Sequence, residues 1–256
     1  MNNNEVIRSI KELKKDTKNH SIFEVEDLAT LEFAMKGQLK ALLFVYCEEL
    51  CYSDLAKSVI NYFKTNSKEV YEVSKKLYER VIDKDNAQGL IATFKAPTYH
   101  LNDYQNAKNI VILDGIETPG NVGTMIRTCD ACKTDLIIIT NEKARLFSPK
   151  TMLASRGMQL FVPIIESDYE TTQKFLDENH FSVYLAEPIE GKDYQKYTYQ
   201  GKNAIVVGSE RYGIDKRYFD HPHLKVFIPM KGRMTSLNVG VAASIIIYEA
   251  FMQQNR

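Results

Sequence analysis

The 256-residue sequence contains no tryptophan, no long apolar run and no excess of either charge. No segment approaches the roughly 18 consecutive apolar residues of a membrane span. The first residues, MNNNEVIRSIKELKK, lack the apolar core of a signal peptide. We therefore expect a cytoplasmic protein that does not associate with a membrane. Because Lys plus Arg and Asp plus Glu both number 33, no global charge predicts nucleic-acid binding, and any basic surface must be local.

Cysteine is also scarce, with two pairs at Cys47 and Cys51 and at Cys129 and Cys132. In a cytoplasmic protein these thiols are expected to be reduced. The C-x-x-x-C and C-x-x-C spacings allow a zinc site, but the second pair lies inside a helical pattern and neither pair has a His at matching spacing. We favour small buried apolar side chains over zinc ligands, and we predict no metal.

The N-terminal residues begin with an amphipathic pattern that has a basic face. This face, over residues 6–18, carries Arg8, Lys11, Lys14, Lys15 and Lys18. A solvated surface is the favoured interpretation, and a contact with RNA phosphates is the sharper alternative.

Helical and extended patterns then alternate as far as residue 94. Helices are expected at 26–35, 53–63 and 74–82, and strands at 40–46, 69–73 and 89–94. This alternation predicts a small α/β domain over residues 1–98. Residues 95–107 show no periodicity, which indicates a linker.

From residue 109 the apolar pattern becomes stronger. Ile- and Val-rich runs lie at 110–113, 136–139, 160–165, 183–186, 204–207 and 226–228, and the clearest helices at 122–132, 169–179 and 237–252. Near-continuous apolar strands between helices are typical of a parallel sheet covered on both faces. A second α/β domain with a mostly parallel sheet is therefore expected over residues 106–256.

Residues 226–249 contain a strand, a polar loop and an apolar helix in succession. Pro229 ends the strand, and Ser236 is the expected N-cap of the helix. Apolar residues form two stripes around this helix, and one sheet can cover only one of them. An ordinary capped core helix is one interpretation. A second subunit that covers the other stripe is the interpretation we favour.

Small and polar residues gather at the ends of three of the predicted strands. After 110–113, Asn121 begins a helix and Arg127 lies off its apolar stripe, where burial of an unpaired guanidinium would be very costly. After 204–207, the run GSERYG places Glu210 in a sharp turn. After 226–228, Asn238 follows a polar loop. Carboxyl ends of strands are where open α/β sheets bind ligands.

In order and spacing, these three segments resemble the motifs of the SpoU/TrmH family of RNA ribose 2'-O-methyltransferases, within the SPOUT class. An Asn at a helix start with an Arg six residues on, the G-x-E-x-x-G turn and the IPM-x-G-x-x-x-SLNV run are all present between residues 109 and 249. The ASRG segment at 154–157 is also similar to the family, most of all to its thiostrepton-resistance branch. Tyr212 and Met234 depart from the usual pattern at positions that shape a pocket.

The resemblance implies a deep trefoil knot in the C-terminal parallel-sheet domain, which is an exception to the rule against threaded chains. It implies S-adenosylmethionine as cofactor, with contacts at Gly208, Ile228 and Leu237. It further implies an obligate homodimer with the site at the subunit interface, and a small N-terminal α/β domain that binds RNA.

The resemblance also assigns the catalytic positions, which are Arg127, Asn121, Glu210, Ser236 and Asn238. Methyl transfer to a ribose hydroxyl requires alignment and the removal of one proton, but no metal. Because a guanidinium is a poor base at neutral pH, we interpret Arg127 as a fixed cation that stabilises the developing alkoxide. The two Asn side chains would hold the ribose and a phosphate, Ser236 would shape the loop, and Glu210 would orient Arg127 or the substrate.

Ribosomal RNA is the favoured substrate because the resemblance includes a separate N-terminal domain. Methylation of ribosomal RNA that confers drug resistance is a special case of this function. The alternatives are a transfer-RNA 2'-O-methyltransferase and a non-catalytic RNA-binding relative. A nicotinamide enzyme, with Glu142 near the position of a ribose-binding acid, is a further alternative. The glycine spacing after residue 114 is not G-x-G-x-x-G, which argues against it.

Overall fold

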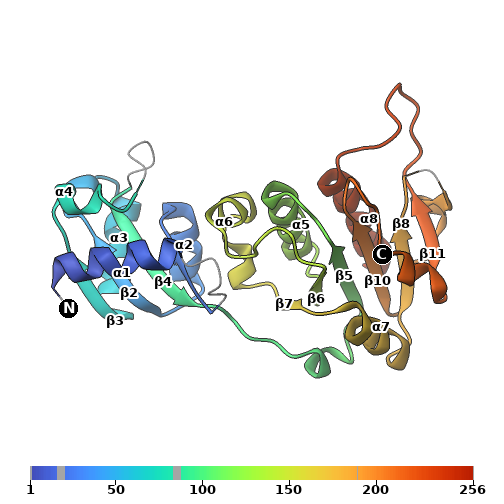
Figure 1. The fold of residues 1–256 in the computed structure, drawn as a ribbon, viewed down its shortest axis with the longest axis horizontal. Coiled ribbons are helices and arrows are strands. Elements are labelled where there is room, and N and C mark those ends of the chain that lie inside the picture. Colours follow the sequence, from blue (N-terminus) through green and yellow to red (C-terminus); the bar gives the residue numbers. More distant parts are fainter. Residues whose placement is uncertain (1, 16–20, 83–87, 189, 256) are drawn as a thin grey trace. The chain divides into compact units, whose positions relative to one another are not determined.

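Residues 2–15, 21–82, 88–188 and 190–255 are described by the computed structural model of the chain. The chain divides into an N-terminal unit, Met1–Pro97, and a C-terminal unit, Thr98–Arg256 (Figure 1). Within the described residues, no helix has both the length and the apolar character that a bilayer crossing requires.

The N-terminal unit is built on a mixed sheet with the strand order β1-β4-β2-β3. Strands β1 (Ile22–Val25) and β2 (Ala41–Tyr46) pair antiparallel with β4 (Leu90–Lys95), and β3 (Ser67–Glu72) pairs parallel with β2. Strand β1 was not predicted from the sequence. Its four residues are too short to show a period, and its partner lies about 70 positions away in the chain, where Phe23 pairs with Phe94.

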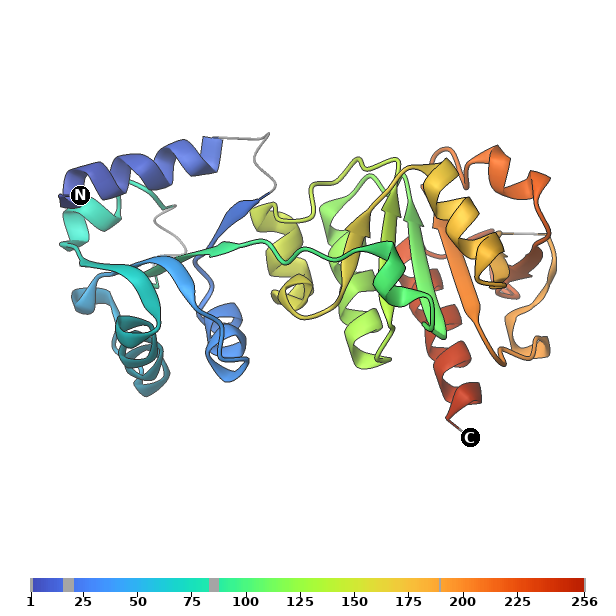
Figure 2. The same ribbon diagram turned by 90° about the horizontal axis from the view of Figure 1, so that it is seen from below.

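Helices cover both faces of this sheet (Figures 1 and 2). On one face, α1 (Asn3–Lys15) and the short α4 (Lys75–Tyr78) enclose an apolar cluster that includes Val6, Ile10 and Ile91. On the other face lie α2 (Leu28–Lys36) and α3 (Asp54–Thr65). The expected helix at 74–82 is shorter than predicted.

The basic face of α1 is partly engaged within the protein. Arg8 forms an exposed ion pair with Glu12, and the Lys14 ammonium donates to the Val81 carbonyl at 2.6 Å while pairing with Glu26. The predicted contribution of Lys18 lies outside the described residues. These internal contacts reduce the charge that α1 can offer to a partner.

The C-terminal unit contains a sheet in which every pairing is parallel, with the order β7-β6-β5-β10-β8-β11-β9. Its strands are β5 (Asn109–Asp114), β6 (Leu136–Thr140), β7 (Ile164–Glu166), β8 (Ser182–Ala186), β9 (Lys192–Asp193), β10 (Asn203–Gly208) and β11 (Leu224–Phe227). The predicted α/β class and parallel sheet are confirmed. The trefoil knot stays a prediction.

Alternating residues of the central strands face two apolar layers. Val111, Leu113 and Ile137 pack with α5 (Pro119–Ala131) and α8 (Val239–Gln254) on one face. Ile110 and Ile112 pack with α7 (Tyr169–Glu178) on the other. Helix α6 (Pro149–Ser155) lies against α5. This burial on both faces explains why the strands are apolar at nearly every position.

Two predicted segments differ from the structure in their details. The expected strand at 160–165 begins only at Ile164, because residues Met158–Leu160 form a 3-10 turn after the left-handed Gly157. Most of the predicted linker belongs to the C-terminal unit. Within it, Leu101–Tyr104 form a second 3-10 turn that packs on the α7 side of the core. Further 3-10 turns lie at Glu48–Leu50, Tyr194–Lys196 and Lys216–Asp220.

Candidate active site

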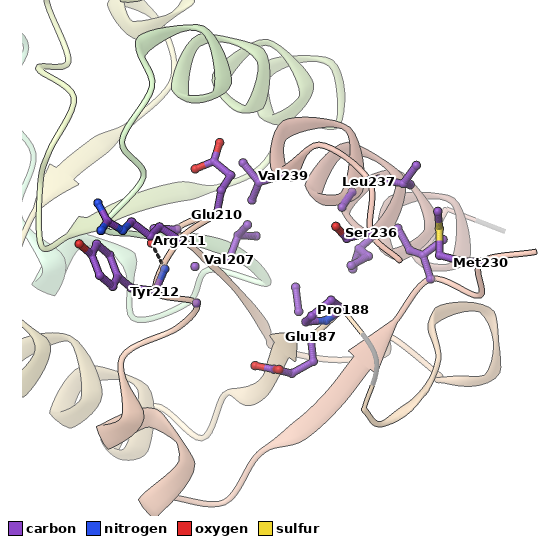
Figure 3. A pocket seen from close by; sticks show the side chains of 17 residues that line it. Glu187, Pro188, Val207, Glu210, Arg211, Tyr212, Met230, Ser236, Leu237 and Val239 are labelled. Carbon is purple, nitrogen blue, oxygen red and sulfur yellow. Dashed lines mark hydrogen bonds between the residues drawn. The ribbon is translucent and has the colours of Figure 1, made fainter. Parts of the chain in front are cut away.

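A pocket of about 440 Å³ opens at the carboxyl ends of β8, β10 and β11 (Figure 3). Because the strands are parallel, the segments that follow them meet at one edge of the sheet. The three predicted cofactor contacts, Gly208, Ile228 and Leu237, all line this pocket. So do Glu210 and Ser236. The structure thus gathers five of the predicted site residues around one cavity.

The pocket wall after β10 is a tight turn held by backbone hydrogen bonds. The Ser209 and Gly213 amides each donate to the other's carbonyl, at 3.1 and 3.0 Å. The Tyr212 amide donates to the Ser209 hydroxyl at 2.9 Å. A Cβ atom at Gly208 would lie 2.2 Å from the carbonyl carbon of Gly213, so only glycine permits this close approach. The turn is therefore a rigid feature of the site.

A buried carboxylate anchors the chain just beyond this turn. Asp114, at the end of β5, is 2% exposed. It accepts hydrogen bonds from the Thr140 hydroxyl at 2.9 Å, the Asn141 side-chain amide at 2.7 Å and the Asp215 backbone amide at 2.7 Å. Asp114 thus ties the ends of β5 and β6 to the segment that follows β10. This role of Asp114 was not predicted, although a lone carboxylate at the end of an apolar strand is a signal that the sequence contains.

The three predicted motif segments are joined by one chain of side-chain hydrogen bonds. The side-chain nitrogen Nδ2 of Asn121 donates to the Glu210 carboxylate. The Asn238 amide nitrogen donates to Oδ1 of Asn121 at 3.1 Å. Oδ1 of Asn238 in turn accepts from the Gly240 and Val241 amides at 3.0 and 3.3 Å. Each amide has a distinct donor side and acceptor side, so these partners define the orientation of both Asn side chains.

The N-cap of α8 is Asn238, and the prediction that Ser236 caps this helix was wrong. Ser and Asn are both good N-cap residues. Here Asn238 accepts from two amides of the first turn, which leaves the exposed Ser236 to line the pocket. Helix α5 starts in a similar way. The Thr118 side chain accepts a hydrogen bond from the backbone amide of Asn121, and Pro119 occupies the first turn.

Arg127 stands apart from the pocket of its own chain. It is exposed on α5, six residues after Asn121, and does not line the cavity. Within the described part of the chain its side chain makes no hydrogen bond or ion pair. The expected contact between Glu210 and Arg127 is therefore not observed in the described residues, and Glu210 accepts from Asn121 instead.

Helix α8 carries one buried and one exposed apolar stripe. Ala243, Ile246 and Ala250 lie in the core of the unit. Val241, Tyr248 and Met252 remain 46%, 47% and 43% exposed. Helix α5 lies beside α8, where Thr128 and Ser244 hydroxyls are 2.7 Å apart. The exposed stripe and the exposed face of α5 that bears Arg127 belong to the same pair of helices.

One acidic side chain at the pocket has a shifted pKa. Burial raises the pKa of the Glu187 carboxyl, a shift that nearby Lys225 opposes. Glu187 follows β8 and lines the cavity, between the turn and the Ser236 loop in the view of Figure 3. Its carboxylate, together with that of Glu210, which lines the same pocket, can attract a ligand with a positive charge, and the Arg211 guanidinium opposes this attraction.

The structure also bears on the two alternative sites. The four cysteines are buried and free, and burial raises the pKa of Cys129 to about 12. No group of three or more His, Cys, Asp or Glu side chains able to hold a metal occurs in the ranges that the structure describes. Glu142 lines a separate hollow of about 820 Å³ near Tyr99 and Asp168, at the ends of β6 and β7.

Comparison with known proteins identifies a relative that spans nearly the whole chain and others that match part of it. A 23S rRNA (guanosine(2553)-2'-O)-methyltransferase, RlmP, of Bacillus subtilis is 28% identical over 249 residues, which cover 96% of this chain and 95% of the relative. A putative TrmH family tRNA/rRNA methyltransferase of Staphylococcus aureus is 34% identical, over 59% of this chain and 61% of the relative.

Solved structures share the fold of both units. An AdoMet-bound rRNA methyltransferase from Sinorhizobium meliloti has a TM-score of 0.83 and 25% identity, over 96% of this chain and 93% of that one. The SpoU methyltransferase AviRb from Streptomyces viridochromogenes has a TM-score of 0.84 and 19% identity, over 97% of each chain. The model of the SpoU rRNA Methylase family matches residues 108–248, which include all three motif segments. The chain therefore belongs to the SpoU rRNA methylase family.

Proposed function

We propose that this protein transfers a methyl group from S-adenosylmethionine to a ribose 2'-hydroxyl of ribosomal RNA, in the cytoplasm. The observation that carries the proposal is the hydrogen-bonded chain from Glu210 through Asn121 to Asn238, which joins three motif segments beside one pocket. Ribosomal RNA is favoured over transfer RNA because the relative named for 23S rRNA aligns with both units of the chain.

The pocket fits the proposed cofactor in shape and in charge. Ile228 and Leu237 supply apolar walls, and the tight turn at Gly208 offers backbone groups at close range. When bound, S-adenosylmethionine supplies a methyl group on a positively charged sulfur. The Glu187 carboxylate, which also lines the pocket, provides complementary charge. We assign Ser236 to shaping the loop that closes this pocket.

Residues outside the pocket would bind the RNA ribose and stabilise its reacting oxygen. In-line displacement at the methyl carbon requires that the ribose hydroxyl be aligned and that its developing charge be stabilised. Asn121 and Asn238 are positioned by their mutual hydrogen bond to offer amide groups to the ribose or its phosphate. Arg127 supplies a permanent cation for the alkoxide, and the reaction needs no metal.

We further propose a homodimer in which the exposed stripe of α8 is covered by a second copy. Val241, Tyr248 and Met252 recur at helical spacing, and such a stripe is usually buried. Because Arg127 lies away from the pocket of its own chain, pairing also supplies a way to bring it to the pocket of the partner. The deep trefoil knot and an RNA-binding role for the N-terminal unit belong to the same proposal.

The experiment that tests this function is a map of 2'-O-methyl groups in ribosomal and transfer RNA from cells with and without the protein. The expected result is one ribosomal ribose methyl that disappears with the protein and is restored in vitro by purified protein with S-adenosylmethionine. Loss of a transfer-RNA methyl instead would identify the other substrate class. Unchanged maps, together with cofactor-independent RNA binding, would identify a non-catalytic relative.

A further inference from the structure

The turn beside the pocket presents an aromatic ring to solvent. Tyr212 is 72% exposed, and the guanidinium carbon of Arg211 lies 5.1 Å from the centroid of its ring. Figure 3 shows both side chains on the side of the turn that faces away from Ser236 and Leu237. With the guanidinium over one face of the ring, the large exposed fraction leaves the other face open. A ring held in this way contributes little to the core.

The backbone that carries this ring is well fixed. The paired hydrogen bonds between Ser209 and Gly213 close the turn, and the Ser209 hydroxyl accepts from the Tyr212 amide itself. Asp114 holds the next residues through the Asp215 amide at 2.7 Å. A ligand that meets Tyr212 therefore loses little affinity to the ordering of the loop.

We propose that Tyr212, backed by Arg211, is a stacking platform for an RNA base next to the nucleotide that is methylated. This inference rests on the proposed function and adds a substrate contact to it. Bases of single-stranded RNA stack on exposed aromatic rings, and a guanidinium strengthens the stack and attracts the neighbouring phosphate.

The position of the ring within the turn favours this occupant. Glu210, two residues earlier, lies on the side of the turn that meets Asn121 and the pocket. Arg211 and Tyr212 line the edge of the same pocket, so one rigid turn places the ring next to the reacting site. Exposed Lys231 and Arg233, in the loop that also borders the pocket, add positive charge for the RNA backbone.

A fluorescence experiment tests the platform without requiring activity. Because the chain contains no tryptophan, Tyr212→Trp introduces the sole indole. We expect saturable quenching of its fluorescence by a short oligoadenylate, and none by inorganic polyphosphate, which offers charge without bases. Leu224→Trp is the control, since Leu224 is 38% exposed in the same unit but does not line the pocket. Equal quenching of both variants, or quenching of neither, would overturn the proposal.

Kinetics with ribosomal RNA give the second test. Tyr212→Ala should raise KM for RNA by about 5- to 150-fold, as expected for one lost base stack. Because Tyr212 also lines the pocket, Kd for S-adenosylmethionine is measured separately, and the change in KM should exceed the change in that Kd. A rise in Kd that accounts for the whole change in KM would assign Tyr212 to the pocket and overturn the platform. Tyr212→Phe should restore KM, and Tyr212→Leu should not, because bulk alone does not stack. A Leu variant with the KM of the Phe variant would overturn the platform. An inactive wild type would instead contradict the proposed function, and the fluorescence result would still decide the stacking.

Discussion

The side-chain amide of Asn238 donates a 3.1 Å hydrogen bond to Asn121 across 117 positions of the sequence. The acceptor oxygen of Asn238 caps α8 at the same time. One side chain therefore starts the last helix and attaches it to the start of α5. The positive end of the α8 dipole is in this way connected through Asn121 to the Glu210 carboxylate.

Replacement of Asn238 separates its two tasks. Asn238→Asp keeps an acceptor for the α8 amides but loses the donor to Asn121, so we expect near-normal stability with impaired methyl transfer. Asn238→Ala loses both, and should also lower the free energy of unfolding by about 1 kcal/mol. Urea unfolding and methyl-transfer assays measure the two effects. Full activity in the Asp variant would contradict the proposed role of this hydrogen bond.

Arg127→Ala should abolish transfer without affecting the cofactor. The side chain does not line the pocket, so Kd for S-adenosylmethionine should stay unchanged. Loss of a cation that stabilises the alkoxide should lower kcat by at least ~100-fold. Arg127→Lys, which keeps the charge on a different geometry, should recover part of the rate. Turnover of the Ala variant near that of the wild type would remove Arg127 from the mechanism.

Asp114→Asn should weaken cofactor binding from a distance. The substitution replaces one carboxylate oxygen with an NH2 group. That group cannot accept a hydrogen bond, so at least one of the three present donors loses its acceptor. The expected cost is about 1 to 3 kcal/mol in stability. Release of Asp215 should loosen the turn and raise Kd for S-adenosylmethionine. Thr140→Val is the control, because it removes one donor to Asp114 but leaves the Asp215 bond. Equal cofactor affinity in the two variants would argue against this coupling.

Cofactor binding should depend on pH through Glu187. Burial raises the pKa of this carboxyl, and only its charged form attracts the sulfonium, so affinity should fall as pH falls through a value above the usual pKa of about 4.3. The folded state also binds this proton more tightly than the unfolded state. The destabilisation that Glu187 causes is therefore present above its folded pKa and is relieved below it.

Two variants check this pH dependence by calorimetric titration. Glu187→Gln should remove the acidic loss of affinity. Glu178→Gln is the control, because Glu178 is exposed on α7 and does not line the pocket. A pH profile in the Glu187 variant identical to that of the wild type would assign the dependence to another group.

The exposed stripe of α8 gives a prediction about assembly. Tyr248→Asp or Val241→Asp should leave a folded monomer, because both side chains are nearly half exposed in one chain. Ile246→Asp should instead unfold the unit at a cost of several kcal/mol, since Ile246 is 2% exposed in its own core. Sedimentation and circular dichroism separate these outcomes. A wild type that sediments as a monomer with full cofactor affinity would disprove the interface model.

Local patterns in the sequence were sufficient to predict most of the elements. The apolar runs at 110–113 and 204–207 became central parallel strands because each residue there is buried on one face or the other. The family resemblance implied cofactor contacts at Gly208, Ile228 and Leu237, and all three line one pocket. Their contact with the cofactor stays a prediction. The edge strand β1 was missed, because its identity depends on pairing with β4 and not on its own four residues.

Tertiary structure decided which hydrogen-bond partners the polar residues have. The sequence predicted Ser236 as the N-cap of α8, whereas in the folded chain Asn238, held beside the start of α8 by its hydrogen bond to Asn121, is the cap. Asp114 became an anchor because β5 and β10 are neighbours, which places the Asp215 amide against its carboxylate. The sequence determined two apolar stripes on α8. The sheet determined which of them is buried, because it contacts only the face that bears Ile246.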